Sequence, residues 1–211
     1  MRQIGTRPRN RVVALREVVS ACRSLLRGES VTVTGDHVEL QGVALDHPPG
    51  RPPPILIGTT GTQGIALAGE LADGLLLPEG SAPAAITWAT ESLCRPIPAT
   101  VYAWTRVEDD RERALDRVRP IVRSWREGSL YPNLLVHSGL SATGDPDDSQ
   151  IENMAIAGAP RDCTASISRM HAAGAASLVF VPVGDDHEAQ LERIATDVLP
   201  LVAATPTVDG A

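Results

Sequence analysis

Aromatic side chains, long apolar runs and an excess of basic residues are all missing from this sequence. Only 3% of its 211 residues are Phe, Trp or Tyr, although 43% are apolar. A buried core must therefore be built mainly from Val, Leu, Ile and Ala, a mixture that suits parallel sheets covered by helices. The length allows one large domain or two small ones, and one domain over residues 1–211 is our prediction.

The charge balance and the apolar runs exclude several kinds of partner. The net charge is −7, which argues against a nucleic-acid surface or a polybasic membrane patch. No apolar run reaches the roughly 18–20 residues of a membrane span. The basic N-terminus lacks the apolar segment of a signal peptide. We therefore expect a protein of the cytoplasm that binds neither nucleic acid nor membrane.

Cysteine is also scarce. Cys22, Cys94 and Cys163 are odd in number, far apart and without a CxxC spacing, so neither a disulfide framework nor a zinc site is indicated. A reducing cytoplasm fits this usage. Cys163 has His171 eight residues further along the same expected helix, but a buried structural thiol is the favoured interpretation. No metal site is expected.

The first fifty residues indicate a helix followed by a hairpin. Asn10 is a candidate N-cap, apolar residues recur at spacings of three and four over 11–27, and Gly28 marks the end. Residues 30–40 (SVTVTGDHVEL) alternate around Gly-Asp, which is typical of a β-hairpin. Residues 46–54 (DHPPGRPPP) suit a rigid lead-in to a strand better than a PxxP ligand.

From residue 51 to 205 the pattern alternates between short apolar runs and helical segments. Continuous apolar runs indicate strands covered on both faces, and alternation with helices indicates right-handed βαβ units in a parallel sheet. The expected strands are ILIG (55–58), LLLP (75–78), VYAW (101–104) and LVFVP (178–182). The acidic stretch 137–150 is predicted to be a mobile, solvated loop. A cation site at Asp145, Asp147 and Asp148 is disfavoured, because the glycine and glutamate of a calcium loop are missing.

Two segments match known nucleotide-binding and zinc-protease motifs only in part. Gly58, Gly61 and Gly64 form GxxGxxG, which is neither a dinucleotide fingerprint nor a Walker loop. His187-Glu188 begins like a zinc-protease motif, but Leu191 stands where the second histidine belongs.

The end of the first predicted strand is the strongest candidate site. Its residues are Gly58, Thr59, Thr60, Gly61, Thr62 and Gln63, followed at once by an expected helix. Free backbone N–H groups, hydroxyls and the helix dipole favour an anion at such a place. From the residues alone, a phosphate cradle and a simple turn both remain open.

The same stretch resembles a known family. PILIGTTGTQGIALAGELADGLLLPEG (54–80) is similar to a segment of the luciferase-like flavin-dependent oxidoreductases, most closely at LAGELADG (67–74). The helix and hairpin upstream, and IAGAPRDCTASISRMHAAGAASLVFVPVG (156–184) downstream, resemble the family in the same order. The branch that uses the deazaflavin coenzyme F420, which includes the methylenetetrahydromethanopterin reductases, is the most similar.

The resemblance implies an α/β fold, namely the C-terminal half of a (β/α)8 TIM barrel. It implies about four parallel strands with flanking helices and a small hairpin, in a domain truncated at its N-terminus relative to the family: helix and hairpin over 1–50, βα units over 51–205. The loop 58–63 then lies near the cofactor phosphate. Thr62-Gln63 stands where the family often has Pro-Lys or Pro-Arg, so a cationic partner is missing.

The function implied is that of an oxidoreductase using coenzyme F420, or alternatively FMN, to move a hydride to or from a small organic substrate. The family's substrate-side residues come largely from strands that have no counterpart here, so no catalytic residue is carried over. Glu79 and Trp104 are pocket candidates, but a capping acid and a core indole are the favoured interpretations. The alternative is a non-catalytic remnant or partner subunit. Because half a barrel exposes strand edges, we expect a homo-oligomer or a complementing N-terminal half.

Overall fold

The computed structural model describes residue 8 and residues 10–128, 132–140 and 144–204. The chain divides into two compact units. The first comprises the described residues up to 75 together with 93–97, and the second comprises 76–92 and the described residues from 98 onward. The division falls inside a strand, β4 (Gly74–Leu77). A single domain over 1–211 stays a prediction.

The first unit begins as the sequence predicts. Helix α1 (Arg11–Leu26) is capped by Asn10, whose Oδ1 accepts from the N–H groups of Val12 at 3.0 Å and Val13 at 3.2 Å. Strands β1 (Val31–Thr34) and β2 (Glu39–Val43) pair antiparallel. The prediction of a helix followed by a hairpin is therefore confirmed.

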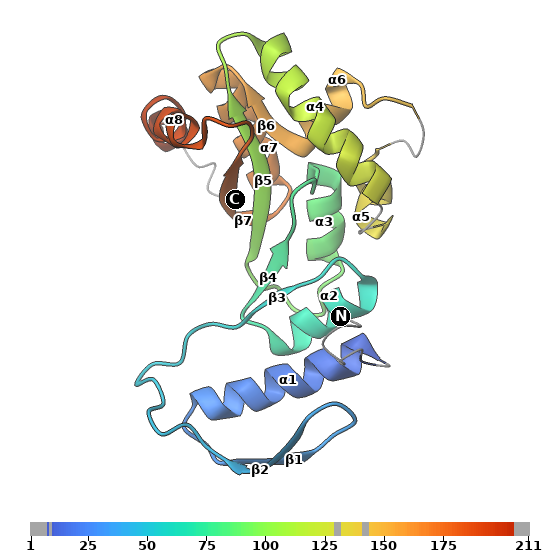
Figure 1. Ribbon diagram of the computed structural model, residues 1–211, viewed down its shortest axis with the longest axis vertical. Coiled ribbons are helices and arrows are strands. Elements are labelled where there is room, and N and C mark those ends of the chain that lie inside the picture. The colour runs from blue at the N-terminus through green and yellow to red at the C-terminus, as the bar shows by residue number, and fades with distance from the viewer. Residues whose placement is uncertain (1–7, 9, 129–131, 141–143, 205–211) are drawn as a thin grey trace. The chain divides into compact units, whose positions relative to one another are not determined.

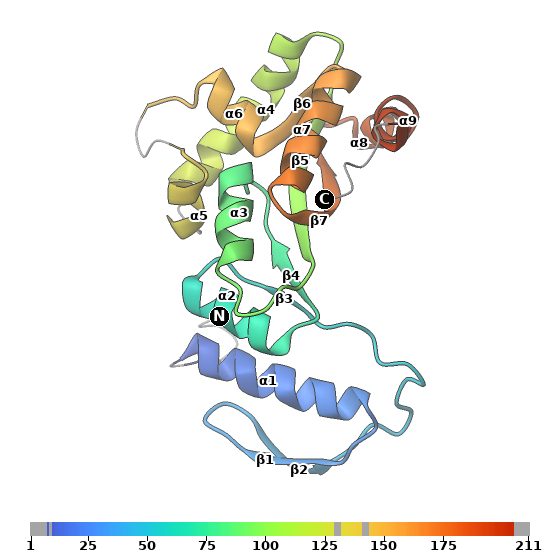
Figure 2. The same cartoon turned by 180° about the vertical axis from the view of Figure 1, so that it is seen from behind.

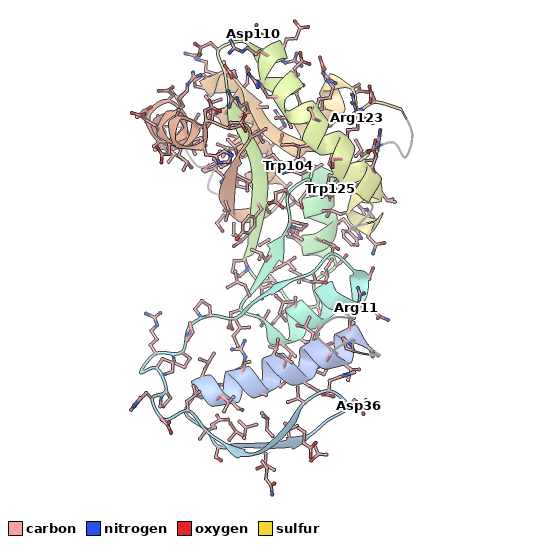
Figure 3. All side chains as sticks on the ribbon, viewed as in Figure 1. Arg11, Asp36, Trp104, Asp110, Arg123 and Trp125 are labelled. Atoms are coloured by element: carbon pink, nitrogen blue, oxygen red, sulfur yellow. The ribbon has the colours of Figure 1, made fainter. Side chains whose placement is uncertain are left out.

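A carboxylate fastens this hairpin to α1. Glu17 accepts hydrogen bonds from the backbone N–H groups of Asp36, His37 and Val38, at 2.9, 2.8 and 2.9 Å. A Cβ at Gly35 would lie 2.5 Å from the Glu17 carboxyl carbon, so a larger residue there would displace this carboxylate from its three hydrogen bonds. Figures 1 and 2 show α1 between the hairpin and α2 (Thr62–Leu71), and Figure 3 marks Asp36 in the turn.

Strand β3 (Leu56–Gly58) leads through a short loop into α2. Residues 46–54 before it form neither helix nor strand, as expected of so much proline. The apolar side chains of the unit gather mainly on α2, where Ile65, Leu67 and Ala68 are almost fully buried. The loop between β3 and α2 thus lies between buried Ile57 of β3 and the buried side chains of α2.

The second unit is built around β5 (Ala99–Val107). Trp104 and Thr105 of β5 pair in parallel with β6 (Ala155–Gly158) and also with β7 (Ala175–Pro182), so these two strands lie on opposite sides of β5. The prediction of a parallel sheet is confirmed. The helices are α3 (Pro83–Glu91), α4 (Arg111–Gly128), α5 (Pro132–His137), α6 (Asp148–Met154), α7 (Pro160–Ala172), α8 (His187–Arg193) and α9 (Leu199–Ala204).

A π-helical segment, η2 (Ile194–Val198), connects α8 to α9. The N–H of Leu199 donates to the carbonyl of Ile194, five residues earlier. Ile194 and Val198 are buried, and η2 and α9 pack against α7. The C-terminal helical segment is therefore anchored on α7.

The core of the second unit lies between the sheet and α4. Leu115, Val118 and Val122 recur at helical spacing on α4 and are fully buried. They pack with Trp104 of β5 and Ile151 of α6. This arrangement follows the amphipathic pattern of α4.

The acidic stretch 137–150 differs in part from the expected loop. Asp147 and Gln150 form a capping box, and α6 begins at Asp148. Arg119 of α4 holds this segment by donating to the Pro146 carbonyl and to Asp148, each at 2.6 Å. The described part from residue 144 onward is thus held against α4 by ion pairs, whereas residues 141–143 lie outside the described residues.

None of the helices in the described part of the chain is both long and apolar enough to cross a membrane.

Candidate functional site

The six predicted site residues form one strand-to-helix connection. Gly58 ends β3, and Thr62 and Gln63 open α2. Gly58, Thr62 and Gln63 are exposed, while Thr59, Thr60 and Gly61 are half-buried. The structure therefore brings all six together at a surface that a ligand can reach.

The start of α2 offers backbone donors. Gly61 is the N-cap residue in an extended conformation, and no side chain caps it. The first intrahelical bond runs from Ile65 N–H to Gly61 O at 2.9 Å. The N–H groups of residues 62–64 precede that bond and lack intrahelical acceptors, as at any helix start. Together with the positive end of the helix dipole, they favour an anion.

Thr59 lies directly over the first turn of α2. A Cβ at Gly64 would lie 2.0 Å from the Thr59 hydroxyl oxygen and 3.0 Å from its Cβ. Glycine at 64 is therefore required for this approach, which gives the third glycine of the motif a packing role. A Cβ at Gly61 would meet nothing within 4 Å. The backbone at Gly61 is thus open to a close approach.

The two threonine hydroxyls complete the donor set. Among the described residues, no hydrogen bond is recorded for the hydroxyl of Thr59 or of Thr60, whereas other hydroxyls such as Thr32 and Thr87 are bonded to backbone groups. Two hydroxyls and the helix start suit the oxygens of a phosphate group. Gln63 adds an amide that can donate without charge.

Asp73 fixes the two strands beside this loop within the first unit. Its carboxylate accepts from Ile55 N–H at 2.8 Å and from Arg23 Nη2 at 2.9 Å, while its own N–H donates to Ile55 O at 2.8 Å. The Ile55 N–H, and then Arg23 against some desolvation, lower the pKa of Asp73. Sequence reasoning included Asp73 only within the family segment. No pattern in the sequence indicates the ion pair of Asp73 with Arg23, which lies fifty residues away.

Trp104 is a core residue. It is 7% exposed and packs edge-on against Trp125 of α4, with ring centroids 6.0 Å apart at 89° (Figure 3). The interpretation as a core indole is confirmed. Thr105, next to it, is also buried and donates its hydroxyl to Ala103 O at 2.9 Å. Glu79 is half-buried in the loop after β4.

The loop after β7 surrounds an arginine that sequence reasoning missed. Arg106 Nη1 donates to Val183 O at 2.9 Å and to Asp186, and its Nε donates to Glu108 at 3.0 Å. Desolvation opposes the charge, but the two carboxylates outweigh it and raise the pKa of Arg106. Gly184 adopts φ +110°, and a Cβ there would lie 2.9 Å from Nη1. Two carboxylates already engage this cation, so it is a structural joint.

The remaining candidates are structural. Cys163 is buried, its Sγ lies 3.5 Å from Gly158 O, and burial raises its pKa to about 12, which makes the reactive thiolate scarce. His171 Nδ1 lies 2.7 Å from Ala175 O. No cluster of three or more potential metal ligands occurs among the described residues.

Known proteins of one family are similar to this chain over most of its length. A model of the luciferase-like monooxygenase family matches residues 1–196. A 5,10-methylenetetrahydromethanopterin reductase of Archaeoglobus fulgidus is 27% identical over an alignment of 219 positions, and the alignment covers 88% of this chain and 65% of that protein. The chain thus spans about two thirds of the length of this relative.

Solved structures show the same fold. An F420-dependent secondary alcohol dehydrogenase in complex with an F420-acetone adduct superposes with a TM-score of 0.71 at 19% identity, over 94% of this chain and 64% of that one. The oxygenating constituent of 3,6-diketocamphane monooxygenase from Pseudomonas putida, in complex with FMN, gives 0.60 at 18% identity over 88% and 62%. The predicted fold class is confirmed.

Proposed function

The chain belongs to the luciferase-like monooxygenase family, and from this premise we propose that it is an oxidoreductase domain that binds a flavin-type cofactor through the loop 58–63. Coenzyme F420 is the first candidate and FMN the alternative. Solved structures of the same fold carry one or the other.

The observation that supports this proposal is the donor set at the start of α2. Gly61 is an N-cap without a side-chain cap, and the hydroxyls of Thr59 and Thr60 have no recorded partner among the described residues. Gly64 lets Thr59 lie against the first turn. Hydroxyls and backbone N–H groups that converge at a helix start fit a phosphate.

The division of labour follows from these residues. The bound cofactor supplies hydride transfer at its ring. The chain's own contribution is to hold the phosphate with Thr59, Thr60 and the N–H groups of α2. Gln63 donates a neutral hydrogen bond, which is weaker than a charge-assisted one. We therefore propose binding that depends on hydroxyls and backbone.

Turnover belongs to the same proposal, with a small organic molecule as the substrate. The chain spans 65% of the length of the Archaeoglobus fulgidus reductase.

A second candidate, binding without turnover in a partner subunit, is favoured by the positions of two polar groups. Thr105 bonds within its own strand and Arg106 is engaged by two carboxylates, so neither is poised toward a substrate.

Titration of the full chain with F420 and with FMN tests the phosphate site. Thr60→Val should weaken binding by about 1–3 kcal/mol, the cost of leaving a polar partner unpaired. Thr34→Val is the matched control, because Thr34 is an exposed threonine of the same unit on β1. Gln63→Lys should strengthen binding, because it supplies a charge-assisted donor.

Two results would contradict the proposal. One is equal affinity of Thr60→Val and Thr34→Val for both cofactors. The other is a chain that binds neither F420 nor FMN. Binding without oxidation of reduced cofactor in the presence of candidate substrates would favour the partner-subunit alternative.

A further inference from the structure

Glu79 differs from the other half-buried carboxylates of the chain in having no partner. The half-buried carboxylates that have one, among the described residues, are Glu17, which binds the hairpin turn, and Asp73, Glu108, Asp148, Glu152 and Asp197, each of which binds an arginine. Glu79 is also half-buried. In the part of the chain that the structure describes, no hydrogen bond or ion pair reaches its carboxylate.

The loop that carries Glu79 is held in place by its neighbours. It follows β4 directly, and the three residues after Glu79 are buried. Ser81 Oγ donates to Pro78 O at 2.6 Å, and Ser138 Oγ donates to Gly80 O at 2.9 Å. The backbone is therefore fixed on both sides of Glu79, while the carboxylate itself stays without a contact.

Apolar side chains lie against the same loop. Gly80 adopts φ +80°, and a Cβ there would lie 3.0 Å from Cζ2 of Trp125 and 3.1 Å from Cε of Met154. Figure 3 labels Trp125 on α4. Charges near apolar groups are screened less than charges at an open surface. The carboxylate of Glu79 thus loses part of its hydration without a compensating partner from the described residues.

Two roles within the fold do not account for Glu79. Helix α3 begins after Ala82 without a side-chain cap, and no backbone N–H of the described residues donates to Glu79, so the interpretation as a capping acid is wrong. One carboxylate is also too few for a calcium or magnesium site. No cluster of three or more potential metal ligands occurs in the described ranges.

We propose that Glu79 binds the protonated amine of a small organic substrate. Arginine is the usual partner of a half-buried carboxylate in this chain, so a cation is the partner that fits Glu79. A protonated amine supplies a charge-assisted hydrogen bond, whereas a hydroxyl supplies only a neutral one. Ligands of α/β folds bind beyond the carboxyl ends of the strands, and Glu79 lies beyond the end of β4.

The inference rests on the proposed function and deepens it by naming the chemical class of the substrate. In that function the loop 58–63 holds the cofactor phosphate, and Glu79 holds the amine of the substrate. The role of Glu79 is to bind and orient this group.

Carbon-13 NMR of the full chain, labelled at the glutamate carboxyl carbons, tests the inference in the absence of cofactor. Loss of one signal in Glu79→Gln identifies Glu79. Butylammonium should shift this signal saturably, and 1-butanol, which has a similar shape but no charge, should bind at least about tenfold more weakly. Glu91 is exposed at the end of α3, and its signal should not move at the same concentrations.

Thermal unfolding separates a binding role from a structural one. Glu79→Gln should leave the midpoint unchanged or raise it, because the carboxylate stabilises nothing in the described fold. Glu108→Gln should lower the midpoint, because Glu108 pairs with the buried Arg106. A lowered midpoint in Glu79→Gln would show that the carboxylate has a structural partner and would overturn the inference.

Two further results would overturn it: no shift of the Glu79 signal with butylammonium, or equal affinity for butylammonium and 1-butanol. The titrations with F420 and FMN are separate measurements. Cofactor binding without butylammonium binding would therefore contradict this inference alone, whereas butylammonium binding without cofactor binding would contradict the proposed function.

Discussion

Different contacts stabilise the inside of each of the two units. In the first, carboxylates join elements far apart in sequence: Glu17 binds the turn at 36–38, and Asp73 binds Arg23 and Ile55. In the second, fully buried side chains of α4 pack against the sheet. The hairpin and β3 of the first unit are thus held by carboxylates, whereas the core around α4 in the second unit is apolar, although the second unit has ion pairs as well, such as that of Arg106 with Asp186. The candidate phosphate site lies in the first unit.

The largest effect is expected in the apolar core. Leu115→Ala should destabilise the second unit by about 2–5 kcal/mol, because Leu115 is fully buried and its truncation leaves a cavity. Segment-resolved hydrogen exchange during denaturant unfolding measures the change. Val18→Ala, at a 46% exposed position on α1, should cost far less. Comparable losses in the two variants would end the distinction between the units.

A smaller effect is expected when the ionic joint of the first unit is cut. Asp73→Ala removes the acceptor of Ile55 N–H and of Arg23. A cost of about 1–3 kcal/mol follows from leaving these donors unpaired. Exchange protection should fall over residues 11–75 and stay unchanged in β5. An Asp73→Ala protein with faster exchange in β5 would show that the two units unfold together.

Acid should reveal the same contrast in the unmodified chain. Desolvation opposes ionisation of Glu17, but the N–H groups of His37, Asp36 and Val38 lower its pKa, and the pKa of Asp73 is also lowered. A carboxyl group whose pKa is lower in the folded than in the unfolded state stabilises the fold at pH values above its unfolded-state pKa. This stabilisation is lost as the pH falls through the folded-state pKa. Loosening should begin below about pH 4.5, the ordinary value for Glu17.

Exchange measured between pH 7 and pH 3 tests this expectation. The segments 31–43 and 55–73 should lose protection first. Asp186 of the second unit also has a lowered pKa, through Arg106, but the buried side chains of α4 do not titrate. Loss of protection in α4 at a higher pH than in the hairpin would contradict the comparison.

The smallest effect is expected for surface ion pairs of α4. Arg119→Gln removes the contact with Asp148 at 2.6 Å, in which Arg119 is 24% and Asp148 49% exposed. Because partly exposed pairs contribute little, the cost should be at most about 1 kcal/mol. It should shrink further in 1 M salt, which screens such pairs. A larger, salt-independent loss would mean that apolar contacts of Arg119 dominate.

Local rules in the sequence predicted most of the regular elements. Asn10 and Gly28 bracket α1 because capping chemistry is local. The continuous apolar runs predicted β3, β4, β5 and β7, because aliphatic and β-branched residues favour strands. Strand β6 was missed, since AIAG is short and consists mostly of small residues, so that it gives no strong apolar periodicity. Helix α6 was missed because its capping box lies in an acidic stretch.

The candidate site was predicted in position but not in its contacts. The pattern of glycine and threonine from 58 to 63 predicts the loop. The resemblance to a family is what implies that a cofactor phosphate lies near it. The packing of Thr59 on Gly64 depends on the exact angle between strand and helix. The networks of Asp73 and Arg106 join residues about fifty and eighty positions apart. No periodicity or motif encodes such long-range pairings.

The π-helical turn at Ile194–Val198 has an evolutionary consequence. It accommodates one residue more than an α-helical turn, as the bond from Leu199 to Ile194 shows. Deleting one residue within it should restore a continuous α-helix and leave the helix after it nearly in the same orientation, because the wider turn takes up the extra residue. Homologues with an unbroken helix should therefore carry a one-residue gap here. The chain thus accommodates an additional residue at this turn while Ile194 and Val198 stay buried.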